Sequence, residues 1–524
     1  MNTIRILATV SALAALSAIQ PFASSAFSQN ASEARAEHAD IGVAPDTSAS
    51  TYKQHTTHPD AQWFGDAAFG LFIHWDISSV RAMNISWPMI PGRALAAKVI
   101  TDPAERARIV RESDYNLNGK PNAITPNEYW SMAALFNPQK YDPDKWAAAA
   151  KAAGFTYVVL TTRHHGGFAL WPSSSGGFDT KNYMGGRDLI KPYIEALRRH
   201  GLKVGLYYSP PDWHFDRDYK NFLYGGATKL NPWLPSLGAD LKPRDPAAAR
   251  TDAEIAAHKA AYAAHVRAQV QELLTRYGKI DLIWFDGKPE GVPNPAEVIT
   301  IAEIRKLQPG IVINPRLHGT GDYVTFERNL PATRPRVNWA EFCNTWTTTW
   351  SHINNAPFRA PGFVLGQLAQ CRAWGINYLL GVGPTKDGEF VPAIYENMSI
   401  VADWMKANSV SIKNTKPLPA GETASVFATA HTFPGYYDAR FLFAIPSFKP
   451  ADRPYPENQL PPADETLTLS GIARPSTVTL LATGKPLDYT YDPAKRAIAI
   501  QLPAALRTKL VDVVRVDLIA PAME

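Results

Sequence analysis

Cysteine is scarce in this chain, with Cys343 and Cys371 the only two among 524 residues. Two cysteines exclude a framework of several disulfides, and they do not form the closely spaced pairs of a structural zinc site. Both stand among apolar neighbours in the sequence. We therefore expect two buried free thiols rather than a disulfide.

Long apolar runs and runs of one charge are also missing. Beyond residue 28 no stretch of about 18 uninterrupted apolar residues occurs, so we expect no membrane span in the mature protein. The formal net charge is only +5, and Lys and Arg are dispersed among acidic residues. This pattern gives no reason to expect a nucleic-acid partner.

The N-terminus has the pattern of an export signal. Arg5 precedes a short apolar run, and small residues such as Ala23 and Ala26 follow it. Residues 1–28 are therefore predicted to be a Sec-type signal peptide, with a retained N-terminal anchor as the alternative. The protein is expected to be exported, to the periplasm or the extracellular space. Residues 29–57, rich in Ala, Ser and Thr, are predicted to be a linker.

Helical patterns alternate with apolar strands over residues 58–416. Five helical segments with period-3.6 apolar spacing each lead into a nearly continuous apolar run, namely YVVLTTR, LKVGLYY, IDLIWF, IVIN and INYLLGV. Such runs are typical of a parallel sheet that is covered on both faces. No GxGxxG or GxxxxGK(S/T) loop follows a strand, which removes the nucleotide-binding reason for an open sheet. We predict an α/β fold with a (β/α)8-type barrel, in preference to an open doubly wound sheet.

The pattern changes after residue 416. Segments such as RFLFAI, TLTLSG, AIAIQLP and VDVVRVDLI alternate with period 2 and are separated by turn residues. Residues 417–524 are therefore predicted to form an antiparallel β-sandwich.

The expected barrel strands end on polar side chains, which are His74, His164 and His165, Tyr208, Asp286, and Arg316. In a barrel the C-terminal ends of the strands converge on one face, where the active site is built. One strand that ends on Asp is ordinary turn chemistry. Five strands with such ends predict a catalytic site.

Two carboxylates that flank a scissile bond are the minimum for glycoside hydrolysis. Asp286, at a rigid strand tip, suits attack on an anomeric carbon. The second carboxylate is left open among Glu327, Glu341 and Glu290. A metal-dependent hydrolase that uses the histidines and Asp286 is the alternative, and a sugar-binding protein on an inactive barrel is the third hypothesis.

Several stretches of the chain resemble the α-L-fucosidases of glycoside hydrolase family 29. They run in family order over about residues 61–416 and include WFGDAAFGLFIHW, TYVVLTTRHHGGFALWPS, GLKVGLYYSPPDW, YGKIDLIWFDG, GDYVTFERNLP and NYLLGVGPTKDGEFVP. The resemblance implies a barrel followed by a β-sandwich, a glycan substrate, no metal or other cofactor, and retention through a covalent glycosyl-enzyme.

The resemblance also implies residue roles. Asp286 in WFDG matches the nucleophile. Glu327 in TFE falls where the family usually has Thr-Pro-Glu with its acid/base, which puts it ahead of Glu341. The sugar-holding positions of the family are matched by His74, Trp87, His164, His165, Tyr208, Trp284 and Arg316.

Three departures from the family pattern concern the substrate. The family's Glu before the tryptophan of the first long loop is Ser86 here, His-Trp-Gly becomes His-Trp-Asp at Asp76, and His-His-Asp becomes His-His-Gly at Gly166. Either Asp76 substitutes for the lost Glu, or the pocket accepts another L-sugar, such as an L-galactoside or an L-glucoside.

Together these observations predict an exported, metal-independent, retaining exo-glycosidase that removes terminal α-L-fucosyl residues from glycans. The alternative keeps the mechanism and changes the sugar. To serve as an acid near neutral pH, Glu327 is expected to have a raised pKa.

Overall fold

The computed structural model describes residues 37–43, 55–116, 124–245, 249–292, 294–433, 437–448 and 457–518. The predicted signal peptide, residues 1–28, lies outside the described residues, as does most of the predicted linker. None of the described helices is long and apolar enough to cross a membrane.

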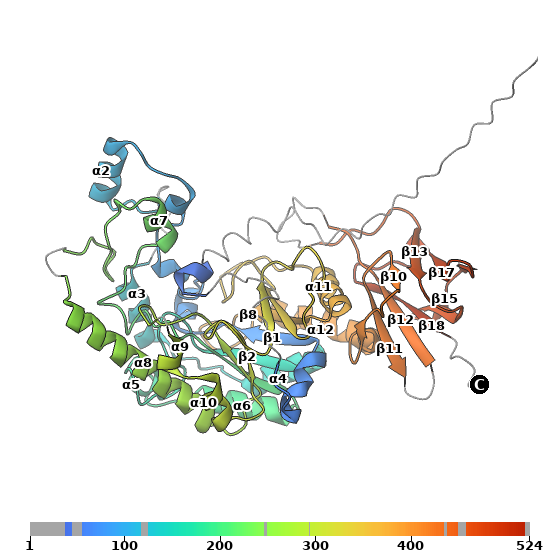
Figure 1. Cartoon of the computed structure of the whole chain (residues 1–524), viewed down its shortest axis with the longest axis horizontal. Helices are drawn as coiled ribbons and strands as arrows, with labels where there is room; N and C mark the ends of the chain where they lie inside the picture. Colours follow the sequence, from blue (N-terminus) through green and yellow to red (C-terminus); the bar gives the residue numbers. More distant parts are fainter. Residues whose placement is uncertain are drawn as a thin grey trace, which may run out of the picture.

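A sheet of parallel strands forms the larger part of the molecule (Figure 1). Its eight strands are β1 (Phe69–Ile73), β2 (Tyr157–Arg163), β3 (Lys203–Tyr208), β4 (Leu282–Phe285), β5 (Val312–Ile313), β6 (Val324–Glu327), β7 (Ala340–Thr345) and β8 (Asn377–Val382). They pair in the order β5-β4-β3-β2-β1-β8-β7-β6. The neighbouring strands of this sheet run parallel, for example β1 and β2 with Leu71 beside Val158. The predicted α/β barrel architecture is confirmed.

Helices cover the outside of this sheet and connect its strands. They are α4 (Pro143–Ala152) before β2, α6 (Ile190–Arg199) before β3, α8 (Asp252–Thr275) before β4, α10 (Ile301–Leu307) before β5, α11 (Pro361–Trp374) before β8 and α12 (Pro392–Asn408) after it. Local sequence determines where they begin. At α4, for instance, the Asp142 side chain accepts hydrogen bonds from two backbone N–H groups, and Pro143 occupies the first turn.

The sheet curls so that its two edge strands meet. Among the described residues no ladder of backbone hydrogen bonds joins β5 to β6. Instead Asp322 links them, because its N–H donates to Ile313 O at 2.8 Å and its carboxylate accepts from Ile313 N at 2.9 Å. This seam lies between the strand that precedes Arg316 and the strand that ends on Glu327.

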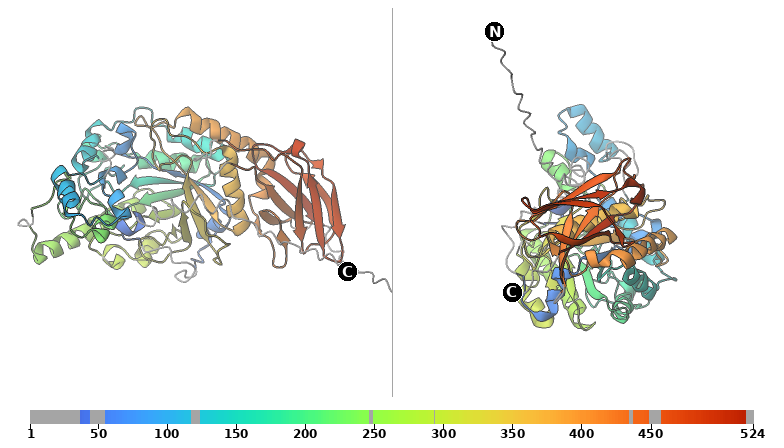
Figure 2. Two further views of the ribbon diagram at one scale, coloured as in Figure 1. Left: turned by 90° about the horizontal axis from the view of Figure 1, so that it is seen from above. Right: turned by 90° about the vertical axis from the view of Figure 1, so that its right-hand side faces the viewer.

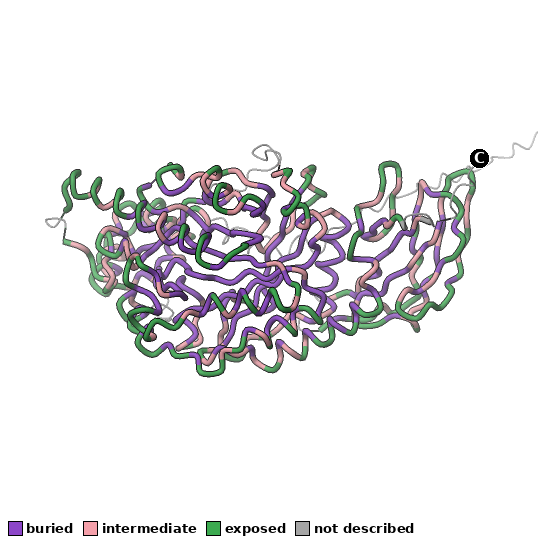
Figure 3. Tube along the Cα trace, turned by 90° about the horizontal axis from the view of Figure 1, so that it is seen from below, coloured by how far each residue is buried: buried purple, intermediate pink, exposed green. Residues whose placement is uncertain are grey.

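Alternate residues of the strands fill the barrel interior. Phe72, Tyr207, Trp284 and Cys343 belong to one buried cluster inside the sheet. Tyr208, one residue beyond Tyr207, belongs to the outer cluster beneath the helices. Figure 3 shows the buried chain concentrated in the strands, with exposed residues around them.

A second unit follows α12 and is antiparallel. One sheet has the order β10-β13-β17-β16 and the other β15-β14-β18-β12-β11-β9. The short strands among them are β9 (Lys416–Pro417), β10 (Thr423–Ala424), β15 (Lys485–Pro486) and β16 (Tyr489–Asp492). Their longest strands are β11 (Ala428–Phe433), β12 (Tyr437–Ala444), β13 (Glu465–Ser470), β14 (Pro475–Leu480), β17 (Ala497–Leu502) and β18 (Asp512–Leu518). The predicted β-sandwich is confirmed, and it packs at the end of the barrel next to α11 and α12 (Figure 2).

Residues 37–43, here called the N-terminal strap, lie against the barrel although they fall within the predicted linker. The Asp40 carboxylate accepts a hydrogen bond from Gly225 N at 2.8 Å, and Ile41 O accepts one from Lys288 N at 2.9 Å. Glu37 forms an ion pair with Arg93 at 2.7 Å. A linker pattern of small polar residues does not reveal such contacts, because they depend on residues far away in the chain.

Candidate active site

Asp286 and Glu327 line the same cavity and contact the same guanidinium. Arg316 donates from Nη1 to Asp286 Oδ1 at 2.8 Å and from Nη2 to Glu327 Oε2 at 2.6 Å. Asp286 directly follows β4, and Glu327 is the last residue of β6. The fold therefore brings the two carboxylates together in one cavity.

Asp286 is held from a second side by Tyr207. The Tyr207 hydroxyl donates to Asp286 Oδ2 at 2.8 Å. His165 Nε2 lies 3.7 Å from the same oxygen. With only 8% of its surface exposed, the Asp286 carboxylate is a fixed and largely desolvated group.

Glu327 differs from its expected protonation state. Burial alone would raise the pKa of Glu327, but the charges of His38 and Arg316 outweigh it and hold the pKa well below its usual value. His38 Nε2 lies 2.7 Å from Glu327 Oε2. The prediction of a raised pKa is thus wrong for this arrangement, because it took no account of Arg316 Nη2 and His38 Nε2 on one carboxylate oxygen.

The other candidate carboxylates lie elsewhere. Glu341, on β7, accepts hydrogen bonds from the Tyr157 hydroxyl at 2.7 Å and from Trp284 Nε1 at 2.8 Å, inside the barrel and away from the cavity lining. Burial raises the pKa of Glu341 to about 7, with these hydrogen bonds opposing the rise. Glu290 pairs with Lys220 at 3.0 Å and does not line the cavity either.

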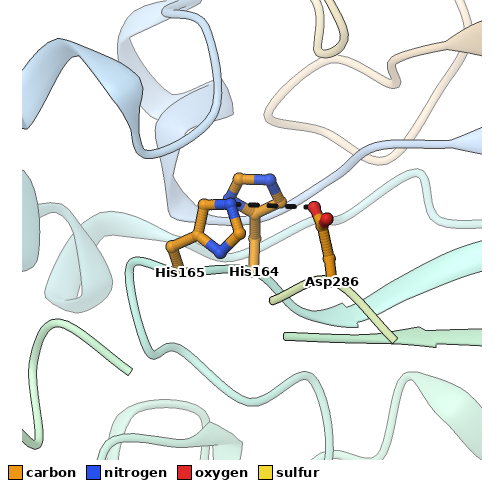
Figure 4. A group of neighbouring side chains, drawn as sticks. All are labelled: His164, His165 and Asp286. Carbon is orange, nitrogen blue, oxygen red and sulfur yellow. Dashed lines mark ion pairs between the residues drawn. The ribbon is translucent and has the colours of Figure 1, made fainter. Parts of the chain in front are cut away.

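Three buried histidines stand beside the carboxylates. Burial lowers the pKa of His74 to about 3 and that of His165 to about 4, and it holds the pKa of His164 well below its usual value. All three imidazoles are therefore neutral near pH 7, where they can both donate and accept hydrogen bonds. Figure 4 shows His164 and His165 side by side, facing Asp286.

The cavity is lined by Glu37, His38, Ile41, Phe72, His74, Trp87, His164, Tyr207, Trp284, Asp286, Arg316, Glu327, Cys343 and Trp350. Of the residues predicted to hold a sugar, His74, Trp87, His164, Trp284 and Arg316 are in this lining. The cavity has a volume of about 350 Å³, part of it open to solvent. Arg316 already contacts both carboxylates, so a sugar that lies between them requires lining groups to move.

Tyr208 does not line the cavity, which corrects its predicted role. Its hydroxyl donates to Gln269 at 3.1 Å, and the Arg163 guanidinium lies 4.4 Å from its ring centre. Tyr207 lines the cavity instead. Successive residues of a strand point to opposite faces, and Tyr207 pairs in register with Trp284. The register with Trp284 shows that Tyr207 points into the barrel, but two adjacent tyrosines in the sequence do not show which of them does.

The lining residues of the strap were not predicted from the sequence. Glu37, His38 and Ile41 cover the side of the cavity where Glu327 lies. Phe72 could have been found, since it stands two residues before His74 on the same strand face. Cys343 also lines the cavity, and both cysteines are buried and free, as expected.

Asp76 does not take the place of the missing family glutamate. Its carboxylate accepts hydrogen bonds from Ser78 N at 2.7 Å and from the Tyr129 hydroxyl at 2.9 Å, and it is absent from the cavity lining. The Ser86 hydroxyl instead contacts His164 and the backbone of Gly166. It lies 2.8 Å from His164 Nδ1 and 2.7 Å from Gly166 N.

The alternative hypothesis is that the histidines and Asp286 bind a metal cation. Ligand atoms of His164, His165 and Asp286 lie within 4.8 Å of one another. The Arg316 guanidinium, however, already contacts Asp286 at 2.8 Å, and its positive charge opposes a second cation at that carboxylate. His74, the fourth residue of the metal hypothesis, is not part of the group.

Comparison of the sequence with known proteins shows which family the chain is similar to. The family described as Alpha-L-fucosidase matches residues 37–410. Tissue alpha-L-fucosidase of Bos taurus is 27% identical over 476 residues, which cover 86% of this chain and 87% of that protein.

Solved structures agree with this match. Alpha-L-fucosidase isoenzyme 1 from Paenibacillus thiaminolyticus is 26% identical, with a TM-score of 0.63 over 88% of this chain and 99% of that one. An alpha-L-fucosidase from Bacteroides thetaiotaomicron with a trapped covalent intermediate has the same fold, at 21% identity, a TM-score of 0.61, and coverage of 92% and 99%. Because the family match spans well over half of the sequence, the chain belongs to the alpha-L-fucosidase family of glycoside hydrolases.

Proposed function

We propose that the protein removes terminal α-L-fucosyl residues from glycans with retention of anomeric configuration, using Asp286 as nucleophile and Glu327 as acid/base. The observation that carries this proposal is the shared contact of both carboxylates with Arg316 in one cavity. Retaining glycosidases need two carboxyl groups roughly 5–5.5 Å apart across the scissile bond. One guanidinium that contacts both groups brings the two carboxylates close together, as this mechanism needs.

In the first step an Asp286 oxygen forms a bond to the anomeric carbon while the bond from that carbon to the leaving oxygen breaks. Protonated Glu327 gives its proton to the leaving oxygen. Arg316 and Tyr207 hold Asp286 in place through 2.8 Å hydrogen bonds. The product of this step is a glycosyl ester on Asp286, the kind of species trapped in the Bacteroides relative.

In the second step ionised Glu327 takes a proton from water, and the water oxygen attacks the anomeric carbon. The bond to Asp286 breaks, and the sugar leaves with its original configuration. Two inversions at one carbon account for the retention.

Glu327 must gain a proton before the first step. In the structure it is held as an anion by His38 and Arg316. A sugar between the carboxylates separates Glu327 from Arg316, and movement of the strap removes His38. Without these charges, burial alone raises the pKa of Glu327 and favours the acid form.

The sugar is proposed to bind among His74, Trp87, His164, His165, Tyr207, Trp284 and Arg316. Neutral imidazoles suit hydroxyl groups because they donate and accept, and the indole faces suit the apolar face of a pyranose.

A specific observation favours a second candidate substrate. The family glutamate that holds the axial hydroxyl of fucose is replaced by Ser86, which hydrogen-bonds to protein groups. The same mechanism on an α-L-galactoside or α-L-glucoside is therefore the alternative function.

The protein is also proposed to act after export, in the periplasm or outside the cell, as the N-terminal pattern of Arg5 and the following apolar run indicates. N-terminal sequencing of the mature protein from its native host tests this. A first residue near position 29 supports export, and an intact Met1 in the cytosolic fraction contradicts it.

Aryl α-L-glycosides of the fuco, galacto, gluco and rhamno series test the substrate and the mechanism together. Fucoside cleavage with the highest kcat/KM, and NMR detection of the α-anomer as first product, support the proposal. Asp286→Ala is expected to lose nearly all turnover and to regain part of it with azide. Undiminished hydrolysis by Asp286→Ala removes the assignment.

A further inference from the structure

Each histidine of the adjacent pair His164–His165 has its Nδ1 against a buried serine hydroxyl. His164 Nδ1 lies 2.8 Å from Ser86 Oγ, and His165 Nδ1 lies 2.6 Å from Ser209 Oγ. Both serines are 0% exposed, so water does not compete for these hydrogen bonds. The two hydroxyls differ in what else they contact, and that difference decides where each imidazole carries its proton.

Ser86 is an acceptor toward the backbone. The N–H of Gly166 donates to Ser86 Oγ at 2.7 Å, and an amide N–H can only donate. Ser86 Oγ uses one lone pair for Gly166, and we assign its hydroxyl proton to His164 Nδ1, which lies 2.8 Å away. His164 Nδ1 then accepts, and its proton is on Nε2.

Ser209 has the opposite polarity. Its hydroxyl donates to Pro211 O at 2.7 Å, and a carbonyl oxygen can only accept. Because Ser209 has no second proton, His165 Nδ1 must be the donor in their 2.6 Å hydrogen bond. The Nε2 of neutral His165 then carries a lone pair.

We propose that Ser86 and Ser209 are positioning residues that fix His164 and His165 in opposite tautomers, so that the pair offers one donor and one acceptor to a sugar hydroxyl. The inference deepens the proposed function, on which its substrate class rests. The ligand it selects is a hydroxyl that accepts from His164 Nε2–H and donates to His165 Nε2. An ether, a fluorine or a deoxy position cannot do both.

Two further observations point to a donor as the missing partner. His165 Nε2 is buried and has no hydrogen-bond partner in the structure. Its nearest charged neighbour is Asp286 Oδ2 at 3.7 Å, which also accepts. An O–H group that enters when lining groups move gives His165 Nε2 the donor that it lacks, and the two imidazole ring centres are only 4.0 Å apart.

Neutron diffraction from deuterium-exchanged crystals of the full chain tests the tautomers directly near pH 7. We expect deuterium on Nε2 of His164 and on Nδ1 of His165. Deuterium on the same atom of both rings, or the reverse pattern, overturns the inference. The result does not depend on whether any glycoside is cleaved, so it stays separate from the proposed function.

A kinetic comparison tests the consequence for the sugar. Ser86→Ala leaves His164 free to place its proton on Nδ1, so we expect kcat/KM for the preferred glycoside to fall about 10- to 100-fold. The matching monodeoxy glycoside, which lacks the bridging hydroxyl, should be cleaved equally well by both enzymes. Equal losses on all monodeoxy substrates indicate a merely structural effect and overturn the inference.

Ser411→Ala is the matched control. Ser411 is also buried, and its hydroxyl donates to Asn408 O at 2.7 Å, far from the cavity lining. This variant should keep the same preference among the monodeoxy substrates as the parent protein. If no α-L-glycoside is cleaved at all, the proposed function fails, and the neutron map still decides the tautomers.

Discussion

Asp286 and Glu327 contact the two terminal nitrogens of one guanidinium, at 2.8 and 2.6 Å from Arg316. The two carboxylates come from β4 and β6, on either side of the seam at which the sheet curls back on itself. Arg316 lies between these strands in the sequence and also stacks 4.5 Å from the Trp284 ring centre. Its planar fork therefore determines how the two carboxylates face each other.

Replacing Arg316 by Lys tests this role. A lysine keeps the charge but loses the fork, so it contacts one carboxylate at a time. We expect kcat/KM to fall by about 100-fold or more, as when a preorganised donor is lost from an active site. Arg267→Lys, at a partly exposed pair with Glu303, is the control and should change kcat/KM little. Parent-like activity of Arg316→Lys contradicts the role.

The strap is expected to move during turnover, since its His38 Nε2 lies 2.7 Å from Glu327 Oε2, the carboxylate that must take up a proton. A β-carbon at Gly42 would lie 3.4 Å from Lys288 Cβ, close to the spacing of a disulfide. The double variant Gly42→Cys with Lys288→Cys should lose activity when oxidised and regain it with a reducing agent. The single variants should not respond, because the native cysteines are buried. An oxidised double variant with full activity shows that the strap need not move.

Glu341 should affect stability in a pH-dependent way. Burial raises the pKa of folded Glu341 to about 7 from an ordinary value of 4.5, so the folded state binds this proton more tightly. Between these pH values, rising pH deprotonates the unfolded chain first and lowers the free energy of unfolding, by up to about 1.4 kcal/mol per pH unit.

Glu341→Gln removes this contribution. Its amide oxygen can still accept from Trp284, and its amide NH₂ can donate to the Tyr157 hydroxyl. The difference in unfolding free energy between variant and parent should therefore grow in favour of the variant from pH 4.5 to pH 7. Denaturant unfolding at several pH values measures it, and a constant difference contradicts the assignment.

Removal of metal ions should leave activity unchanged. His164, His165 and Asp286 are close enough for a cation, but Arg316 already neutralises Asp286. After dialysis against a chelator, kcat/KM should stay within about twofold, because the Arg316 charge opposes a cation at Asp286. Loss of activity that zinc restores would support the metal-dependent alternative.

The strands of the barrel differ in how well the sequence reveals them. Runs such as LIWF are apolar throughout because both faces of the sheet are covered, and they were predicted. β6 (Val324–Glu327) and β7 (Ala340–Thr345) have polar residues inside a short segment, and among the described residues no helix lies between β5 and β6 or between β6 and β7. Neither segment therefore fits the helix–strand pattern from which the other strands were predicted.

The site was predictable where one residue terminates a strand, as at His74, Asp286 and Arg316. It was not predictable where adjacent residues compete, as at Tyr207 and Tyr208, because only the register decides which of them points inward. The contact between His38 and Glu327 spans 289 positions of the chain. No local pattern encodes a contact of that separation.

The central claim is that Asp286 forms a bond to the sugar. The most direct measurement is peptide mapping by mass spectrometry after reaction with a 2-fluoro glycosyl fluoride of the preferred L-sugar. The account predicts one fluoroglycosyl group per chain, attached to Asp286, and none on the Asp286→Ala variant. Attachment to another residue, or turnover that gives the inverted anomer without any adduct, contradicts it.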